Sequence, residues 1–151
     1  MNTAPTTASI SDALLDSLVQ TSFTVIGIVT AVAAQHDLSL TLLRVTAILR
    51  DRSLTMSELA AYLGLDRSTI TGLINRAEQR NLMRRVGNEN DKRSTRVTLT
   101  RTGQSLASTC AAEISQEIAP LVAPLTPSET KRLTKLLTLT LNAQLLSQRA
   151  E

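Results

Sequence analysis

Aromatic residues, cysteine and histidine are almost absent from this sequence of 151 residues. It has no tryptophan; Phe23 and Tyr62 are its only aromatics, and Cys110 and His36 are each the sole residue of their kind. One cysteine cannot form an intramolecular disulfide, and one cysteine with one histidine cannot complete a Cys/His zinc site within a single chain. Disulfide-stapled and zinc-finger classes are therefore excluded, and we expect neither a metal nor a cofactor.

Motifs of catalysis and of export are also missing. The sequence has no glycine-rich phosphate loop, no nucleophile elbow and no paired metal motif, so we expect no enzyme and assign no catalytic residue. The longest apolar run, residues 23–34, is interrupted by Thr24, Gly27 and Thr30 and is shorter than the roughly 20 residues that cross a bilayer. Residues 1–9 show no signal-peptide pattern, which favours a cytoplasmic protein without a membrane span.

Aliphatic residues supply the material for a core. Hydrophobic residues make up 42% of the chain and charged residues 19%, which is typical of a folded protein rather than a disordered one. The length suits one domain, or one domain with a helical appendage.

Positive charge is concentrated in the middle of the chain. Residues 43–100 contain 11 Lys or Arg against 6 Asp or Glu, a net charge of +5, whereas the remaining residues sum to −2. A basic segment attracts polyanions, which suits nucleic acid or an anionic membrane surface. Charge alone does not choose between these partners, and a merely solvated basic surface is the alternative.

Long helices are predicted at the two ends of the chain. After a loose tail at residues 1–8, Ser9 or Ser11 can cap a helix that reaches about Gln35, and a second helix opens near Ser39 or Thr41 and ends before Asp51. The first helix has a wide apolar stripe formed by Leu14, Leu15, Leu18, Val25, Ile26, Val29, Val32 and Ala33.

Two short helices separated by a tight turn are predicted next. Thr55 and Glu58 form a capping box, and Gly64 suits the end of the helix that they begin. Asp66 is a good N-cap for the following helix, which ends near Asn81. Its apolar face consists of Ile70, Leu73, Ile74 and Ala77.

A β-hairpin and two more helices complete the expected order. Residues 82–86 and 95–99 are predicted strands, and the polar residues 87–94 between them form a projecting turn. Thr100 then caps a helix reaching towards Pro120, and residues 126–129 begin the last helix with a second capping box. That helix has its own stripe, formed by Leu133, Leu136, Leu137, Leu141 and Leu145.

A short helix, a tight turn, a second helix and a charged hairpin make a winged helix-turn-helix. Its second helix fits the major groove of DNA, which is about 12 Å wide. The side chains expected to face DNA are Arg67, Ser68, Thr69, Thr71, Asn75 and Arg76. The small Thr71 and Gly72 would let DNA approach closely. The alternative is a helix face that is only solvated.

The hairpin tip is the second expected contact with DNA. Arg93 can enter the adjacent minor groove, where the negative potential is concentrated. Lys92 adds a second cation, while Asp91 would be repelled by phosphate and is expected to hold Arg93 through a carboxylate–guanidinium bond. A turn that is charged only because turns are exposed is the alternative.

These motifs together resemble the MarR family of bacterial transcriptional regulators. The segments that carry the resemblance are residues 54–60, 65–71, 81–82, 91–93 and 98–103. The resemblance implies an obligate homodimer in which the first and last two helices of each subunit interlock. It also implies a repressor that is released from DNA by a small ligand or by oxidation.

The expected architecture is mainly α with a small β-hairpin wing. Residues 1–8 form a tail, residues 39–100 a winged helix-turn-helix that binds double-stranded DNA, and residues 9–38 and 101–151 a helical dimerisation region. The end helices carry more apolar surface than a small winged domain can cover, which favours a homodimer on a pseudo-palindromic operator. A monomer whose end helices pack on its own core is the alternative.

Three features bear on regulation. Cys110 lies among alanines, so a buried inert thiol is favoured over a redox sensor. An effector pocket should be aliphatic and take a small apolar or amphipathic molecule. His36 is expected to interact with the end of the first helix rather than with a metal. The competing function is a winged-helix module for protein–protein assembly that does not read DNA.

Overall fold

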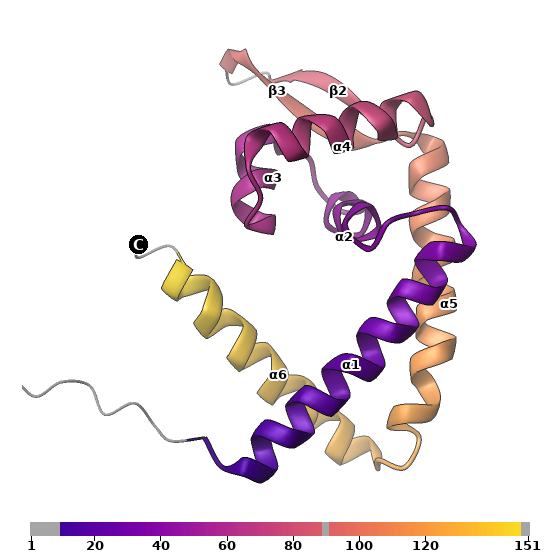
Figure 1. The fold of residues 1–151 in the computed structure, drawn as a ribbon, viewed down its shortest axis with the longest axis vertical. Helices are drawn as coiled ribbons and strands as arrows, with labels where there is room; N and C mark the ends of the chain where they lie inside the picture. The colour runs from indigo at the N-terminus through magenta and orange to yellow at the C-terminus, as the bar shows by residue number, and fades with distance from the viewer. Residues whose placement is uncertain (1–9, 89–90, 149–151) are drawn as a thin grey trace, which may run out of the picture. The chain divides into compact units, whose positions relative to one another are not determined.

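A computed structural model describes residues 10–88 and 91–148 of the chain, and the side chains of residues 88, 91–94 and 143–148 are not described. The predicted tail at residues 1–8 therefore lies outside the described residues. The elements, shown in Figure 1, are α1 (Asp12–Gln35), α2 (Leu40–Leu49), β1 (Leu54–Thr55), α3 (Met56–Leu63), α4 (Arg67–Gln79), β2 (Met83–Asn88), β3 (Asp91–Leu99), α5 (Arg101–Val122) and α6 (Pro127–Gln148). They divide into two compact units, Met1–Ile114 and Ser115–Glu151.

The predicted order of elements is confirmed, and the caps explain the helix boundaries. Thr55 and Glu58 form the complete capping box of α3, and Gly64 ends that helix with φ of 65°. Asp66 caps α4 by accepting a hydrogen bond from the backbone N–H of Thr69. Asn81, just beyond α4, adopts a positive φ of 55°, as is common where a helix ends.

The strands differ from the prediction. Residues 87–94 were expected to form a turn, but β2 extends to Asn88 and β3 begins at Asp91. Strand pairing needs only backbone hydrogen bonds, so polar side chains did not end the ladder, although its register shifts between Gly87 and Asn88. A short strand, β1, was not predicted; it pairs with β3 and gives an antiparallel sheet of order β1-β3-β2.

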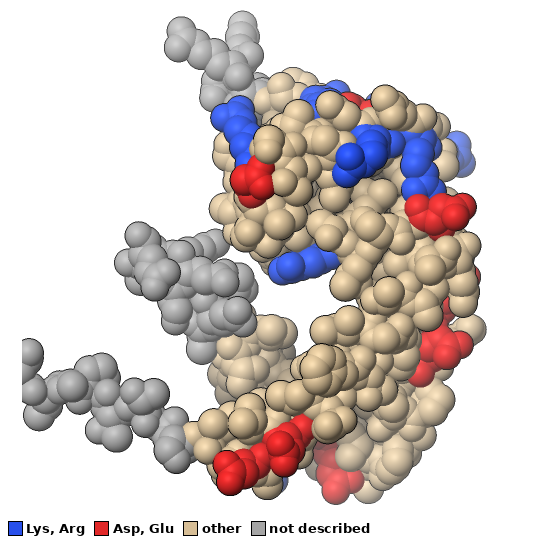
Figure 2. Space-filling model, viewed as in Figure 1, with Lys and Arg blue, Asp and Glu red and all other residues tan. Residues whose placement is uncertain are grey.

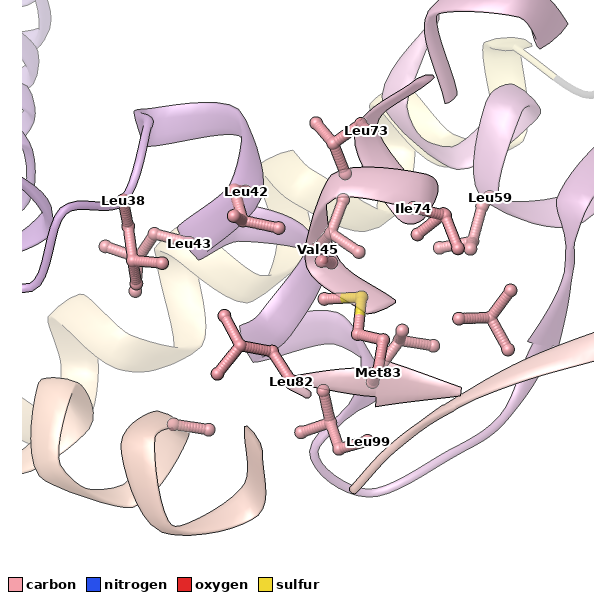
Figure 3. Close-up of a cluster of buried hydrophobic side chains, with 14 of the residues drawn as sticks. Leu38, Leu42, Leu43, Val45, Leu59, Leu73, Ile74, Leu82, Met83 and Leu99 are labelled. Atoms are coloured by element: carbon pink, nitrogen blue, oxygen red, sulfur yellow. The ribbon is translucent and has the colours of Figure 1, made fainter. Parts of the chain in front are cut away.

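The core of the first unit lies within the winged-helix region. Figure 3 shows leucines of α2 together with residues of α3, α4 and the sheet, such as Leu59, Ile74 and Met83. Ala107 and Cys110 of α5 join this core. In contrast, α1 contributes only Val32 and Ala33 as buried residues.

Helix α1 leaves most of its apolar surface exposed. Its exposed large apolar side chains are Leu14, Leu15, Leu18, Val19, Phe23 and Ile26. Contrary to the sequence prediction, α1 is long and apolar enough to cross a membrane, judged by length and composition alone. This is weak support for a span, because a core helix of a soluble protein meets the same criteria.

The second unit consists of the end of α5 and the whole of α6. Helix α5 continues past Pro120 to Val122. Thr126 and Glu129 form the predicted capping box of α6, with Glu129 Oε2 accepting from the Thr126 backbone N–H at 2.8 Å. Among the side chains of α6 that the structure describes, the exposed leucines are Leu133, Leu136, Leu137, Leu139 and Leu141, and the side chain of the predicted stripe residue Leu145 lies outside the described residues.

Candidate nucleic-acid interface

Helix α4 presents two opposite faces. Its apolar face is buried, with Ile70 and Ile74 at 0% exposure. The six positions predicted to face DNA, Arg67, Ser68, Thr69, Thr71, Asn75 and Arg76, are all exposed. The geometry of these side chains decides what each can offer to a partner.

Asp66 organises the first turn of α4. Its Oδ1 accepts from the Ser68 hydroxyl at 2.5 Å, and its Oδ2 accepts from the Thr69 hydroxyl at 2.5 Å. These hydroxyl donors, with the Thr69 backbone N–H, hold the pKa of Asp66 well below its usual range. Since both hydroxyl protons are directed to Asp66, Ser68 and Thr69 present acceptor lone pairs outward.

The next turn of α4 borders a polar hollow. The Thr71 hydroxyl donates to the Arg67 carbonyl at 2.8 Å, so this side chain also presents an acceptor and a methyl group. The hollow has a volume of about 310 Å³ and joins α3, α4 and the sheet. Its lining residues are Thr55, Met56, Ser57, Arg67, Thr71, Arg85 and Thr95.

Arg85 on β2 is a functional candidate that the sequence reasoning missed. Its Nη1 pairs with Glu78 of α4, and its Nη2 donates to Asn75 Oδ1 at 2.8 Å. The alternation of side chains along a strand could have drawn attention to Arg85. It lies two residues after the buried Met83, so both side chains are on the same side of β2. A second missed arginine, Arg96, donates from Nε to the Ser53 hydroxyl at 3.0 Å and braces the segment before α3.

The predicted wing residues Asp91, Lys92 and Arg93 open β3, but their side chains lie outside the described residues. The predicted bond between Asp91 and Arg93 therefore remains a prediction.

In the view of Figure 2, Lys and Arg side chains gather over the winged-helix region. The hairpin and α4 belong to this same basic part of the chain.

A second cavity in the first unit is apolar. It has a volume of about 530 Å³ and is lined by Ile26, Val29, Leu40, Leu43, Arg44, Ala47, Arg50, Ala107, Cys110, Ala111 and Ile114. Arg44 and Arg50 are the charged residues of this lining, and both are exposed. Most of the other lining residues are aliphatic, and the predicted aliphatic effector pocket remains a prediction.

Cys110 of α5 lines this cavity, and His36 follows α1, another helix that lines it. Cys110 is buried, and its burial, together with the nearby carboxylate of Glu113, raises the pKa of the thiol. His36 directly follows α1, and its backbone N–H donates to carbonyl groups at the end of that helix, while its imidazole Nε2 lies 2.7 Å from Glu113 Oε2 on α5. A clustering of three or more metal-ligating side chains is absent from the residues that the structure describes.

Comparison with known proteins identifies relatives of this fold. Residues 38–95 match the family model described as MarR family. Three similar structures have TM-scores of 0.72, 0.68 and 0.71: RV1404 from Mycobacterium tuberculosis, a cysteine-to-serine mutant of MarR from E. coli complexed with operator DNA, and NadR in complex with 4-hydroxyphenylacetate. No curated protein matches the chain in sequence.

The similarity to these structures extends over most of each chain. RV1404 is 25% identical, with 92% of this chain and 98% of RV1404 covered. The operator-bound MarR is 23% identical, with 86% of this chain and 94% of MarR covered. NadR is also 23% identical, with 91% of this chain and 96% of NadR covered. Two further similar structures, AbsC from Streptomyces coelicolor and PA4135, are described as transcriptional regulators. In its matched segment and in its fold, the chain is thus similar to the MarR family of winged helix-turn-helix transcriptional regulators.

Proposed function

We propose that this protein is a homodimeric regulator that binds a pseudo-palindromic operator in double-stranded DNA, represses transcription in the cytoplasm and responds to a small ligand. The observation that carries the DNA-binding proposal is the exposed polar face of α4 in the basic part of the chain. A relative of the same fold, MarR from E. coli, has been solved with operator DNA.

In this proposal α4 enters the major groove and divides its contacts by hydrogen-bond type. Arg67, Asn75 and Arg76 supply donors, which suit the acceptors of guanine and the phosphates. Ser68 and Thr69 supply acceptors, because their hydroxyl groups donate their hydrogen bonds to Asp66. Thr71 adds a methyl group, which can contact the methyl group of thymine.

The wing supplies a separate contact. Arg93 reaches the neighbouring minor groove, Lys92 strengthens the attraction to phosphate, and Asp91 orients Arg93. The winged helix-turn-helix of residues 39–100 is thus the proposed DNA-binding domain.

Residues 9–38 and 101–151 form the proposed dimerisation region. Both α1 and α6 expose apolar surface; Leu14 of α1 is 51% exposed and Leu136 of α6 is 51% exposed. Burial of such surface contributes about 25 cal/mol per Å². A second copy of the chain covers these faces in a two-fold arrangement and sets two α4 helices about one turn of DNA apart.

The apolar cavity is the proposed effector site. Its aliphatic wall with Arg44 and Arg50 suits a small amphipathic molecule that carries an anionic group. NadR, a relative of the same fold, has been solved with 4-hydroxyphenylacetate. Because α1, α2 and α5 all line the cavity, a ligand that moves them against one another would alter how the DNA-binding domains are held.

Titration of duplex DNA at several salt concentrations tests the proposed function. A protein that contacts phosphate releases counterions, so the logarithm of its affinity falls with the logarithm of salt concentration, with a slope of about −0.9 for each phosphate neutralised. We expect a slope of several units on random duplex and a tighter complex with operator fragments selected from genomic DNA. Absent binding, or binding without salt dependence, would instead favour the protein–protein assembly module.

A further inference from the structure

Arg85 links the wing to the proposed reading face of α4. Glu78 holds it at two points: Glu78 Oε1 accepts from the Arg85 backbone N–H at 3.1 Å, and Glu78 Oε2 pairs with the guanidinium. The two side chains are partly buried, at 30% and 29% exposure, so this pair is better shielded from solvent than a surface ion pair. The other arm of the guanidinium donates to Asn75 Oδ1 at 2.8 Å.

The contact between Arg85 and Asn75 has one possible polarity. A guanidinium has five N–H donors and no acceptor, so only the oxygen end of an amide can face it. The amide of Asn75 therefore turns its Nδ2 amino group away from Arg85. Asn75 itself is exposed on α4, and Arg85 lines the polar hollow beside Arg67 and Thr71 of the same helix.

This polarity changes what Asn75 can read. An unconstrained asparagine recognises adenine with both ends of its amide, donating to N7 and accepting from the N6 amino group. Arg85 takes one of the two lone pairs of the Asn75 oxygen and holds that oxygen towards β2, so the amino group is the end of the amide directed away from the strand. The acceptors available to such a donor in the major groove are purine N7, guanine O6 and thymine O4, whereas the cytosine N4 amino group is a donor and does not match.

We propose that Arg85 is a positioning residue that sets base preference: it fixes the Asn75 amide so that this residue reads DNA as a hydrogen-bond donor only. The inference rests on the proposed DNA-binding function. It assigns to Arg85 a role through Asn75 rather than through a contact of its own with phosphate, and it makes Glu78 the residue that keeps the guanidinium in place.

The test begins by finding the base pair that Asn75 reads. Operator duplexes carrying each of the four base pairs at every half-site position are titrated with the wild-type protein and with Asn75→Ala. The position at which Asn75→Ala loses discrimination is the position read by Asn75. We expect the wild-type protein to favour guanine or thymine over cytosine there by about 5- to 10-fold, at the lower end of what a good base contact contributes.

The variant Arg85→Met then removes the guanidinium and its N–H donors while keeping an unbranched apolar side chain. With the Asn75 oxygen released, we expect the preference against cytosine to fall to about 2-fold or less and adenine to gain affinity relative to the other bases. Arg85→Lys retains the charge but cannot engage Glu78 and Asn75 with a planar fork, so it should show the same loss of preference. This second variant preserves the test if Arg85→Met folds poorly.

Arg84→Met is the matched control. Arg84 is the neighbouring arginine of β2 and is exposed, and its substitution by methionine removes the same charge. It should leave the base preference unchanged. The double variant Asn75→Ala, Arg85→Met should show the same preference as Asn75→Ala alone, since the effect of Arg85 passes through the amide.

Two outcomes would overturn the inference in distinguishable ways. If Arg85→Met weakens binding to all duplexes equally and lowers the salt slope by about 1, Arg85 contacts phosphate and has no effect on base preference. That result would leave the proposed function intact. If the wild-type protein binds no duplex DNA, the proposed function fails and the inference fails with it.

Discussion

Gly103 lies at the start of α5, directly against the backbone of Leu82. A Cβ added at this position would lie 1.9 Å from the Leu82 carbonyl oxygen and 2.9 Å from its carbonyl carbon. Because backbone atoms cannot rotate away as a side chain can, α5 would have to shift from the hairpin. We expect Gly103→Ala to lower the free energy of unfolding by about 1 to 3 kcal/mol, measured by urea titration.

Gly72→Ala is the matched control for this substitution. The added Cβ in α4 would meet only Arg76 Nη1, at an ordinary 3.7 Å. Alanine favours a helix interior over glycine by about 0.5–1 kcal/mol, so this variant should gain stability. Equal losses in the two variants would show that close packing of Gly103 is not the cause.

Asp66 makes the stability of the protein depend on pH. Its pKa is lowered in the folded protein by hydrogen bonds from Ser68 and Thr69, so its carboxylate stabilises the fold above the unfolded pKa of about 3.9. This stabilisation is lost as the pH falls from there through the folded pKa. We therefore expect wild type to exceed Asp66→Asn in unfolding free energy at pH 7 and the difference to shrink below about pH 4. A constant difference between pH 7 and pH 3 would contradict this origin.

The wing is the element on which the proposed DNA contact is easiest to isolate. Arg93 is the third residue of β3, whereas the buried residues of this strand are Val97 and Leu99, so we expect truncation of Arg93 to leave the core intact. We expect Arg93→Ala to weaken operator affinity by about 1–3 kcal/mol in a fluorescence titration, with an unchanged thermal midpoint. Lys131→Ala, which removes a cation from α6, should have no such effect, and equal affinity of wild type and Arg93→Ala would remove the wing from the mechanism.

Helix boundaries could be predicted from the sequence because their signals are local. Thr55, Gly64 and Asp66 act within one turn of the chain, and each occupies the predicted cap. The extent of the hairpin could not be predicted, since pairing of β2 with β3 depends on backbone bonds to which side-chain pattern contributes little. The strand β1 was missed for the same reason, because its two residues pair with Val97 and Arg96, far along the chain.

For the candidate site too, local features could be predicted from the sequence and contacts between distant segments could not. The exposed positions of α4 follow from helical periodicity, and the structure has all six at the surface. The bonds of Arg85 to Glu78 and Asn75 join a strand to a helix, and helical periodicity carries no information about such a partner. Sequence reasoning therefore predicted which residues are exposed but not how Arg85 orients one of them.

At the scale of the whole molecule, the proposed homodimer depends on the exposed apolar faces of α1 and α6. Leu18 of α1 is 44% exposed and Leu137 of α6 is 45% exposed, and large exposed apolar patches are typical of interfaces. In the proposed homodimer, Leu18→Asp or Leu137→Asp would place a charge in the buried contact, at a large cost in desolvation. We expect wild type to sediment at twice its chain mass of 16.3 kDa and each variant to dissociate towards the monomer.

Gln20→Asp is the matched control for these variants, because it adds the same charge at an exposed polar position of α1. It should remain dimeric. Since two α4 helices share one operator, the dissociating variants should also lose affinity for the palindrome more than for a single half-site. A wild-type protein that sediments as a monomer and floats with lipid vesicles would contradict the homodimer, because a membrane would then cover the apolar face of α1.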